Sequence, residues 1–481
     1  MKKLLSEVDY MDLKIQANKL SGKISIPKSK SMGHRAIICA SLANGISHIR
    51  HLTYSNDIMA TINAMKALGV KIEFYNEELV VRGIGNCIDV EKSVSIIKNC
   101  GKNKDIINID VKESGSTIRF LLPLLSLFDN DFVINSQGKL LKRPLDPYFY
   151  IYDKLGIIYR IENNILFIEN NKKFEDSIYK FDGNISSQFI SGMMFLLPLL
   201  NFDSRIIIDG YLESKAYVDM TIDSLKTFGV EIVNIDYKEF IIRGNQKYKS
   251  QDIEVEGDFS QAAFFLVANS LQKINANSIT DYIYVQGLKE DSNQADKDLI
   301  YLLNILDYIN TSMTFDKKKF DDAMLKIFNE YMVKVYKGKS PIYIKENRLI
   351  IDGKDIPDII PILSLYLSLS NFKSKIINIA RLKIKESDRL QAIYSELKKL
   401  GVEIEYGEDF LSINPSQILE GNIEVDSYKD HRIAMMLAIS SLFTSSPIKI
   451  KDAQCVNKSY PDFWKDFESL GGEIFECNMG K

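Results

Sequence analysis

The chain contains 481 residues, of which 46% are apolar and 26% carry a charge, proportions that are ordinary for a globular protein. This length exceeds what one hydrophobic core usually supports, so two domains are predicted. The formal net charge of −3 argues against a nucleic-acid-binding protein, and it means that any anion site must be built from a few cations placed together.

Cysteine usage and apolar runs predict the compartment. The five cysteines form no Cys-x-x-Cys pair and show no metal-ligand spacing, so we expect no disulfide framework, no metal and no cofactor. No signal-peptide pattern is present, and together these features predict a cytoplasmic protein. The longest apolar run, residues 189–200, is too short to cross a bilayer, so no membrane association is expected.

One phrase recurs along the chain, an amphipathic helix that ends in Leu-Gly or Phe-Gly and is followed by a short β-prone run. Glycine after a helix supplies the left-handed cap, so each copy predicts a helix, a stop and a strand. The copies centre on Gly69, Gly156, Gly229, Gly401 and Gly471. A weaker copy has Asp307 in place of the glycine. Six copies predict six duplicated units, three in each domain.

A second kind of helix alternates with these and is apolar on nearly every side, which predicts burial inside a domain. Its members are expected at residues 31–43, 116–127, 187–200, 259–271, 358–369 and 430–443. Each follows a short polar phrase whose Ser, Thr or Asp is, in the simplest interpretation, only an N-cap. The recurrence favours a second interpretation, in which the six polar ends face one cleft and their free N–H groups form an anion trap.

The domain boundaries are placed at two strands that precede these units. The strand "KISIP" ends at Pro27, and "DIEVEG" begins at Asp252. The predicted N-terminal lobe therefore covers residues 28–254. The C-terminal lobe covers residues 1–27 plus 255–481, with an insertion near residues 315–345 that has no counterpart in the other units.

Basic and hydroxyl side chains gather at the expected helix starts of the N-terminal lobe. "PKSKSMGHRA" places Lys30 and Ser31 at a helix start and Arg35 one turn later on the same side, which suits a phosphate or carboxylate. In "ESGSTIRF", Gly115 lets a backbone approach a ligand closely, the Ser-Thr pair after it is the expected cap, and Arg119 lies in the first turn.

Further polar phrases of this lobe offer donors for a hydroxylated or anionic ligand. They contain Arg143 in "LLKRPLDP", Ser186, Ser187 and Gln188 in "ISSQF", and Ser214 and Tyr217 in "ESKAYVDM". Each of these residues taken singly is more often structural than functional.

The C-terminal lobe contains the most informative phrase, "RLKIKESDRL". It places Glu386 between Lys385 and Arg389 at a helix start, with the intervening serine as the expected cap. A carboxylate between two cations suits acid–base work or an ion pair. "YKDHRIAM" adds Arg432, "VNKSYPDF" adds Lys458, and "DIPDIIPIL" adds Asp358, a carboxylate that is either a helix cap or a functional group.

In this order, "PKSKS", "ESGST", "KRP", "SSQF", "SKAY", "KESDR", "DHR" and "NKSYPDF" resemble the motifs of the 5-enolpyruvylshikimate-3-phosphate (EPSP) synthase family over nearly the whole chain. The resemblance implies an α/β fold of two domains, each an inside-out barrel of three βαβαββ repeats. It also implies a transferase of the shikimate pathway to chorismate and aromatic amino acids. The expected reaction moves the enolpyruvyl group of phosphoenolpyruvate to the 5-hydroxyl of shikimate 3-phosphate and releases phosphate through a tetrahedral intermediate.

The resemblance also assigns the residues of the site. Those implied to bind shikimate 3-phosphate are Lys30, Ser31, Arg35, Ser186, Ser187, Gln188, Ser214, Tyr217, Asp358 and Lys385. Those implied to bind phosphoenolpyruvate are Lys30, Gly115, Arg143, Gln188, Arg389, Arg432 and Lys458. Asp358 and Glu386 are the implied proton-transfer groups, with Lys30 assisting. The expected partners are these two small substrates, and the protein is expected to be a monomer.

Two alternatives remain. The related enolpyruvyl transferase that acts on UDP-N-acetylglucosamine usually carries an Ala-Lys-Asn phrase and a reactive loop cysteine, whereas this chain has Ser-Lys-Ser and no cysteine between Cys100 and Cys455. A non-catalytic anion-binding protein of the same fold is expected to lose Asp358, Glu386 or a cleft cation, and all of these are present.

Overall fold

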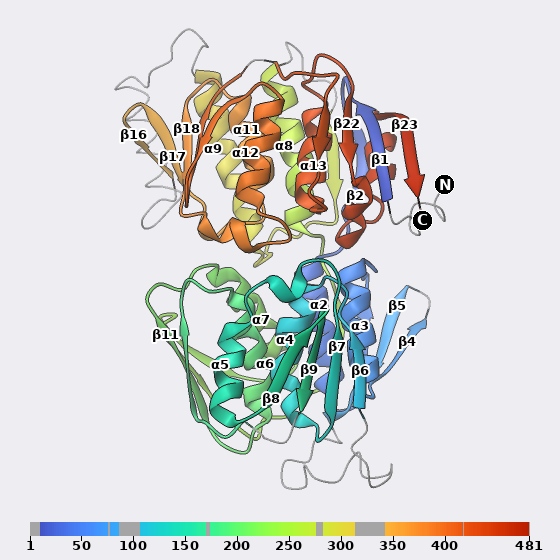
Figure 1. The fold of residues 1–481 in the computed structure, drawn as a ribbon, viewed down its shortest axis with the longest axis vertical. Coiled ribbons are helices and arrows are strands. Elements are labelled where there is room, and N and C mark those ends of the chain that lie inside the picture. The colour runs from blue at the N-terminus through green and yellow to red at the C-terminus, as the bar shows by residue number, and fades with distance from the viewer. Residues whose placement is uncertain are drawn as a thin grey trace. The chain divides into compact units, whose positions relative to one another are not determined.

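A computed structural model describes residues 10–75, 77–85, 106–169, 174–275, 282–312, 342–416 and 418–480. The chain divides into two units, Pro27–Gly257 and Met1–Ile26 with Asp258–Lys481 (Figure 1). Each unit has its own core of buried aliphatic and aromatic side chains. Most of the predicted insertion, residues 315–341, lies outside the described residues, and its last part forms a strand.

The unit Pro27–Gly257 contains three successive repeats of helices and strands. The first repeat has α2 (Lys30–Leu42), β3 (Ile46–Arg50), α3 (Asn56–Ala67), β4 (Lys71–Tyr75) and β5 (Glu78–Arg82), and β14 (Asp252–Glu254) joins its sheet. The second has β6 (Ile106–Asp110), α4 (Gly115–Leu124), β7 (Asp131–Asn135), α5 (Asp146–Leu155), β8 (Ile158–Glu162) and β9 (Ile165–Glu169). The third has β10 (Ile178–Asp182), α6 (Ser187–Leu196), β11 (Ser204–Asp209), α7 (Lys215–Thr227), β12 (Ile232–Ile235) and β13 (Glu239–Ile242).

The sheets of this unit share one strand order. In each, the first two strands are parallel and the next two are antiparallel, as in β6-β7-β9-β8 and β10-β11-β13-β12. A parallel pair needs a crossover connection, and in the second and third repeats the buried helices α4 and α6 supply it. The hairpin that closes each sheet follows the second, half-exposed helix.

The other unit builds the same pattern from both ends of the chain. Its first group has β2 (Gly22–Ser25), α8 (Phe259–Asn275), β15 (Ile283–Gln286), α9 (Asp298–Ser312) and β16 (Ile342–Lys345). Its second has β17 (Arg348–Asp352), α11 (Ile360–Ser368), β18 (Ser374–Ile377), α12 (Arg389–Lys399), β19 (Glu403–Tyr406) and β20 (Leu411–Asn414). Its third has β21 (Glu424–Asp426), α13 (His431–Ser440), β22 (Ile448–Lys451), α14 (Phe463–Ser469), β23 (Glu473–Gly480) and β1 (Tyr10–Gln16).

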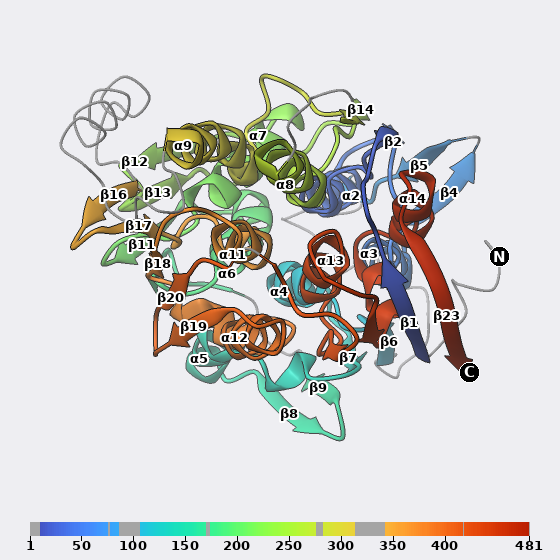
Figure 2. The ribbon, with the colours of Figure 1, turned by 90° about the horizontal axis from the view of Figure 1, so that it is seen from above.

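Buried helices form the centre of this unit, and sheets form its outside. Helices α8, α11 and α13 pack against one another, and Figure 2 shows them inside the strands of their unit. In the other unit, α4 packs against both α2 and α6. The predicted α/β class and the predicted burial of these helices are confirmed. The strands of the described residues group into six separate sheets, so each layer of strands is interrupted.

The recurrent glycines end their helices as predicted. All five have positive φ angles, from 70° at Gly156 to 108° at Gly471. The weaker copy is different, because α9 continues past Asp307 to Ser312. The Asp307 carboxylate accepts hydrogen bonds from Ser270 Oγ (2.8 Å) and Tyr366 Oη (2.7 Å), so it joins α9 to two other helices. The predicted helix stop at this copy is therefore wrong.

Candidate functional site

The start of α2 presents a capped helix with two cations. Ser29, one residue before the predicted pair, is the N-cap. Lys30 Nζ lies 2.8 Å from Asp57 Oδ2, and Ser31 follows in the first turn. Arg35 is buried, and its guanidinium donates to Thr221 Oγ1 (2.8 Å) and to two backbone carbonyls, one of them that of Tyr217 (2.8 Å). Arg35 therefore ties α2 to α7 within this unit.

Two arginines converge on the first residue of α4. A Cβ atom on Gly115 would lie 2.9 Å from Arg143 Nη1 and 3.2 Å from Arg119 Nη1. Arg119 Nη1 donates to Gln188 Oε1 (2.8 Å), and Gln188 Nε2 lies 2.8 Å from Ser116 Oγ. Glycine leaves the guanidinium groups in reach of the helix N-terminus, an arrangement suited to an anion. The cap is Ser114, so the predicted capping by Ser116 and Thr117 is wrong.

Hydroxyl groups mark the starts of α6 and α7. Ser186 is the N-cap of α6 and accepts from Gln188 N (3.4 Å), and Ser187 is the first residue of that helix. Ser214 precedes α7 and has a left-handed backbone, with φ of 54°. Tyr217 lies in the first turn of α7, where its carbonyl accepts from Arg35. These predicted residues thus lie at helix starts of one unit.

In the other unit, three carboxylates surround one guanidinium. Arg389 is buried and is the first residue of α12. It donates through Nη1 to Asp358 Oδ1 (2.9 Å), through Nη2 to Glu386 Oε2 (2.7 Å) and through Nε to Asp430 Oδ2 (2.7 Å). Asp388 caps α12, so the predicted cap at Ser387 is wrong. Ser387 Oγ donates to Asp430 Oδ2 instead (3.1 Å).

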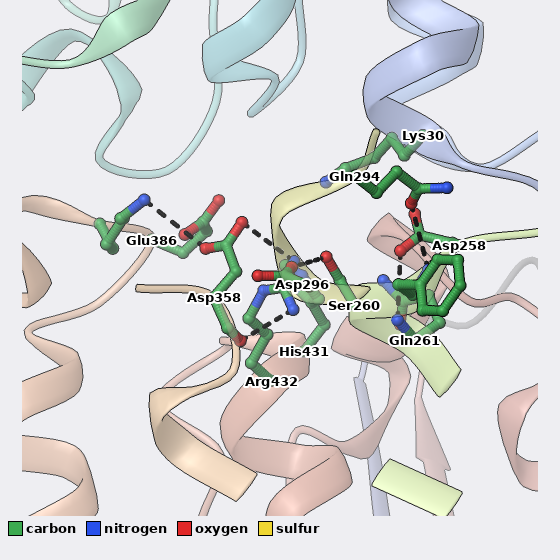
Figure 3. Close-up of polar contacts among 12 residues, drawn as sticks. Lys30, Asp258, Ser260, Gln261, Gln294, Asp296, Asp358, Glu386, His431 and Arg432 are labelled. Carbon is green, nitrogen blue, oxygen red and sulfur yellow. Dashed lines mark hydrogen bonds and ion pairs between the residues drawn. The ribbon is translucent and has the colours of Figure 1, made fainter. Parts of the chain in front are cut away.

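Asp358 lies where cations from several elements meet, and Figure 3 shows it beside Arg432. Its carboxylate contacts Arg389, Lys385 Nζ (3.5 Å) and Arg432 Nη2 (3.2 Å), and its carbonyl accepts from Arg432 Nη1 (2.9 Å). The helix α11 begins two residues later, and no side chain caps it, so Asp358 is not a cap. Although burial opposes it, the charges of Arg432, Lys385 and Arg389 hold the pKa of Asp358 well below its usual range. Asp358 is therefore an ionised carboxylate.

Two lysines complete the predicted set. Desolvation lowers the pKa of Lys385 to about 8, although Asp358 opposes the shift. Lys458 is buried and ends a 3₁₀ helix, Ala453–Lys458. The structure thus brings Asp358, Lys385, Glu386, Arg389 and Arg432 into one cluster of charges, named here the Arg389 cluster, which also includes Asp430.

Three charged residues of these regions were missing from the predicted site. Arg119 was noted in the sequence, and only its contact with Gln188 shows its place beside Gly115. Asp430 precedes the predicted Arg432, and no spacing reveals its contact with Arg389. Asp296 belongs to the phrase "NQADK", which carries no signal of its own, and only the structure shows its contact with Ser260.

Among the described residues, no group of three or more His, Cys, Asp or Glu side chains could hold a metal ion. Within the same ranges, no helix is long and apolar enough to cross a membrane.

Buried helices surrounded by sheets of repeated strand order define an α/β protein built from duplicated units. Solved structures share this fold. An EPSP synthase from Acinetobacter baumannii aligns with a TM-score of 0.66 at 20% identity and covers 97% of this chain and 100% of its own. The enolpyruvyl transferase NikO from Streptomyces tendae has a TM-score of 0.65 at 13% identity over 98% of this chain and 99% of its own. The predicted enolpyruvyl transferase fold is thereby confirmed.

Sequence comparison assigns the family. The model of the EPSP synthase family, 3-phosphoshikimate 1-carboxyvinyltransferase, matches residues 15–467, and the chain belongs to this family. The 3-phosphoshikimate 1-carboxyvinyltransferase of Clostridium botulinum is 46% identical over 97% of this chain and 99% of its own. The protein of the same name from Clostridioides difficile is 45% identical over 98% of this chain and 99% of its own.

Proposed function

We propose that the chain transfers the enolpyruvyl group of phosphoenolpyruvate to the 5-hydroxyl of shikimate 3-phosphate and releases phosphate. It is thus a transferase of the shikimate pathway, which leads to chorismate and the aromatic amino acids. The observation that carries this proposal is the match to the family model over residues 15–467, joined by 46% identity to a named 3-phosphoshikimate 1-carboxyvinyltransferase.

Shikimate 3-phosphate is proposed to bind through donors at the helix starts. Cations and free backbone N–H groups at such positions favour a phosphate. The binding groups in the unit Pro27–Gly257 would be Lys30, Ser31, Arg35, Ser186, Ser187, Gln188, Ser214 and Tyr217. Asp358 and Lys385 would add a hydroxyl acceptor and a cation.

Phosphoenolpyruvate carries a carboxylate and a phosphate, so it needs several cations. Those proposed are Lys30, Arg143, Arg389, Arg432 and Lys458, with Gly115 and Gln188 as hydrogen-bonding neighbours. The approach of Arg143 to Gly115 supports this assignment, because a planar guanidinium can hold an oxyanion through two parallel hydrogen bonds.

The reaction is proposed to proceed by addition and elimination. The 5-oxygen bonds to C2 of phosphoenolpyruvate, the hydroxyl proton leaves, and C3 gains a proton, which gives a tetrahedral intermediate. The C2–O bond to phosphate then breaks and C3 loses a proton, which restores the double bond. Asp358, held ionised by its cations, suits the acceptor of the hydroxyl proton. Glu386 would serve as the second acid–base group, and Lys30 would assist.

The experiment is phosphate release from the purified protein with shikimate 3-phosphate and phosphoenolpyruvate, each omitted in turn. Release that requires both substrates supports the proposal. Asp358→Asn should lower turnover by about 10²–10⁴-fold while binding of shikimate 3-phosphate is kept in part. Asp352→Asn serves as the control. It changes a carboxylate at the end of β17 that pairs with Lys354, and it should keep near-normal turnover.

The same assay separates the alternatives. Release with UDP-N-acetylglucosamine in place of shikimate 3-phosphate would indicate the related transferase. Binding of both substrates without release would indicate the non-catalytic protein. A monomer in the cytoplasm remains part of the proposal, and light scattering of the purified chain tests the oligomeric state.

A further inference from the structure

A buried carboxyl group lies outside the predicted site. Asp296 belongs to the short 3₁₀ helix Ala295–Lys297, which precedes α9, and is 2% exposed. Its Oδ2 accepts a hydrogen bond from Ser260 Oγ. Its Oδ1 is buried and has no hydrogen-bond partner among the described residues. A buried carboxylate oxygen without a donor is costly, whereas a protonated carboxyl group is tolerated there.

The charged groups that act on Asp296 come from several elements. Asp358 before α11 and Arg432 in α13 belong to the Arg389 cluster, and Asp258 lies just before α8. Figure 3 shows Asp296 between Ser260 and the pair Asp358 and Arg432, with His431 close by. Along the chain, Lys297 follows Asp296 directly and Asp298 begins α9.

The charges of the Arg389 cluster leave little room for another negative charge. Three cations, Lys385, Arg389 and Arg432, meet three carboxylates, those of Asp358, Glu386 and Asp430, so the cluster is formally neutral. An ionised Asp296 would make the group negative. It would then compete with an anionic substrate for the charge of Arg432, because like charges in a buried site interact strongly.

We propose that Asp296 is a positioning residue of the enolpyruvyl transfer, an inference that rests on the function proposed above: its carboxyl group is protonated in the active enzyme, and its ionisation withdraws the charge of Arg432 from phosphoenolpyruvate. Asp296 acts through Arg432 and Asp358. Binding of the substrate anion favours the protonated form, so binding of phosphoenolpyruvate is coupled to proton uptake at neutral pH.

The electrostatics place this ionisation in the working range. Burial, followed by the charge of Asp358, raises the pKa of Asp296 to about 7, against the opposing effects of Arg432 and Ser260. Asp358 is ionised at the same pH. Two neighbouring carboxyl groups whose pKa values are driven apart can hold different protonation states, which is the pattern of an acid–base site.

The test is the pH dependence of kcat/KM for phosphoenolpyruvate. For the unaltered enzyme, it should fall about ten-fold between pH 7 and pH 8, of which about five-fold comes from the ionisation of Asp296 and about two-fold from that of Lys385. Asp296→Asn keeps the neutral amide, so this fall should disappear, and only the decline from Lys385, whose pKa is about 8, should remain. Asp298→Asn is the matched control. Desolvation raises the pKa of Asp298 too, but Asp298 is exposed and its charged neighbours are Lys297 and Asp355, so the fall should persist.

A second variant moves the ionisation without removing it. The Ser260 hydroxyl stabilises the ionised form of Asp296, so Ser260→Ala should shift the fall in kcat/KM to higher pH. This shift is opposite to the one expected if Ser260 only helped the protein to fold, because a loosened site admits water and brings the pKa back toward its usual value.

Proton uptake gives a readout that does not need turnover. Calorimetric binding of phosphoenolpyruvate at pH 7.5, in two buffers of different ionisation enthalpy, should show uptake for the unaltered protein and none for Asp296→Asn. The inference is overturned if Asp296→Asn keeps both the fall and the uptake. It is also overturned if Asp296→Asn has the melting temperature of the unaltered protein yet is inactive at every pH. The proton of the Asp296 carboxyl group would then be required for the reaction itself, and a neutral side chain would not be enough. If the unaltered protein takes up a proton but releases no phosphate, the proposed function fails and the assignment of Asp296 stands as a property of the binding site.

Discussion

Arg389 Nη1 lies 2.9 Å from Asp358 Oδ1, and this contact uses only one edge of the guanidinium. The other nitrogens donate to Glu386 and Asp430. The planar group thus holds three carboxylates at fixed directions, two of which belong to the proposed acid–base pair. The positive charges in turn keep Asp358 ionised, so the geometry and the protonation state of the proposed proton acceptor share one cause.

Arg389→Lys should therefore be far from conservative. A lysine ammonium is a point charge that cannot match the fork of the guanidinium, so at least one buried carboxylate loses its partner. The expected loss is about 3–5 kcal/mol in the free energy of unfolding and at least about 100-fold in turnover. Urea unfolding and phosphate release measure the two effects.

The matched control is Arg205→Lys in β11. Arg205 pairs with Glu239 on an exposed surface, where ion pairs contribute about 0–1 kcal/mol. The free energy of unfolding of this variant should lie within about 1 kcal/mol of that of the unaltered protein. Equal effects of the two substitutions would show that the three carboxylates do not depend on the guanidinium of Arg389.

The sequence predicted helix ends correctly where residues close along the chain determine them, and wrongly where residues far away along the chain do. The helix stops at Gly69 and Gly401 follow from a local rule, since a left-handed cap needs only its own backbone. The stop at Asp307 was wrong because partners from two other helices hold that aspartate inside α9. The sequence shows only that an aspartate replaces the glycine, and it does not show which side chains of other helices contact that aspartate.

The site divides in the same way. Lys385, Glu386 and Arg389 were found because they are neighbours in one phrase. Asp430 and Asp296 were missed because their partners lie far away along the chain, at Arg389 and Ser260. Caps were misplaced by one to three residues at α4 and α12, since several hydroxyl or carboxylate groups compete at a helix start and only the backbone geometry selects one.

The low pKa of Asp358 predicts a particular pH dependence of stability. A carboxyl group whose folded pKa lies below its unfolded value adds stability above the unfolded value, about 4, and this stability is lost as the pH falls through the folded pKa. Asp358→Asn should therefore be less stable than the unaltered protein at pH 7. The difference should narrow below about pH 4, as urea unfolding at pH 7, 5 and 3.5 would show.

Asp352→Asn again provides the comparison. The Asp352 carboxylate pairs with the Lys354 ammonium and accepts a hydrogen bond from the Lys354 N–H (3.2 Å). Asparagine can keep the second contact, so its substitution should change the unfolding free energy by no more than about 1 kcal/mol at each pH. If Asp358→Asn kept a constant difference down to pH 3.5, the folded protein would not hold Asp358 ionised, and its assignment as proton acceptor would lose its basis.

Gly115→Ala tests the approach of two arginines to the start of α4. The added Cβ would lie 2.9 Å from Arg143 Nη1 and 3.2 Å from Arg119 Nη1, so the flexible side chains must move. Because they can move, the free energy of unfolding should change by less than about 1 kcal/mol. The moved guanidinium groups should weaken binding of phosphoenolpyruvate by about ten-fold or more, as a raised KM with a smaller change in kcat would show.

A double substitution identifies the group that is displaced. If Gly115→Ala acts by moving Arg143, its effect on KM should shrink once Arg143 is already replaced by alanine, because residues in contact give non-additive effects. Fully additive effects would mean that the methyl group acts on something other than Arg143.

A buried hydrogen-bonded chain joins three helices of the unit Pro27–Gly257. His34 Nδ1 lies 2.7 Å from Thr61 Oγ1, which lies 2.7 Å from Thr117 Oγ1, and Thr117 Oγ1 donates to Ser114 Oγ (2.7 Å) at the cap of α4. Burial lowers the pKa of His34 to about 3, so the ring is neutral. The chain therefore links α2, α3 and α4 through neutral groups.

Thr61→Val removes the central hydroxyl at nearly constant volume and leaves the ring nitrogen of His34 and the Thr117 hydroxyl each short of a partner. The expected loss is about 1–3 kcal/mol in the free energy of unfolding, because buried polar groups then lack hydrogen bonds. Thr227→Val in α7 is the control. Its exposed hydroxyl donates to the Asp223 carbonyl (2.9 Å), so the free energy of unfolding of this variant should lie within about 0.5 kcal/mol of that of the unaltered protein. Urea unfolding compares the two, and equal stabilities would mean that His34 and Thr117 find other partners when Thr61 is lost.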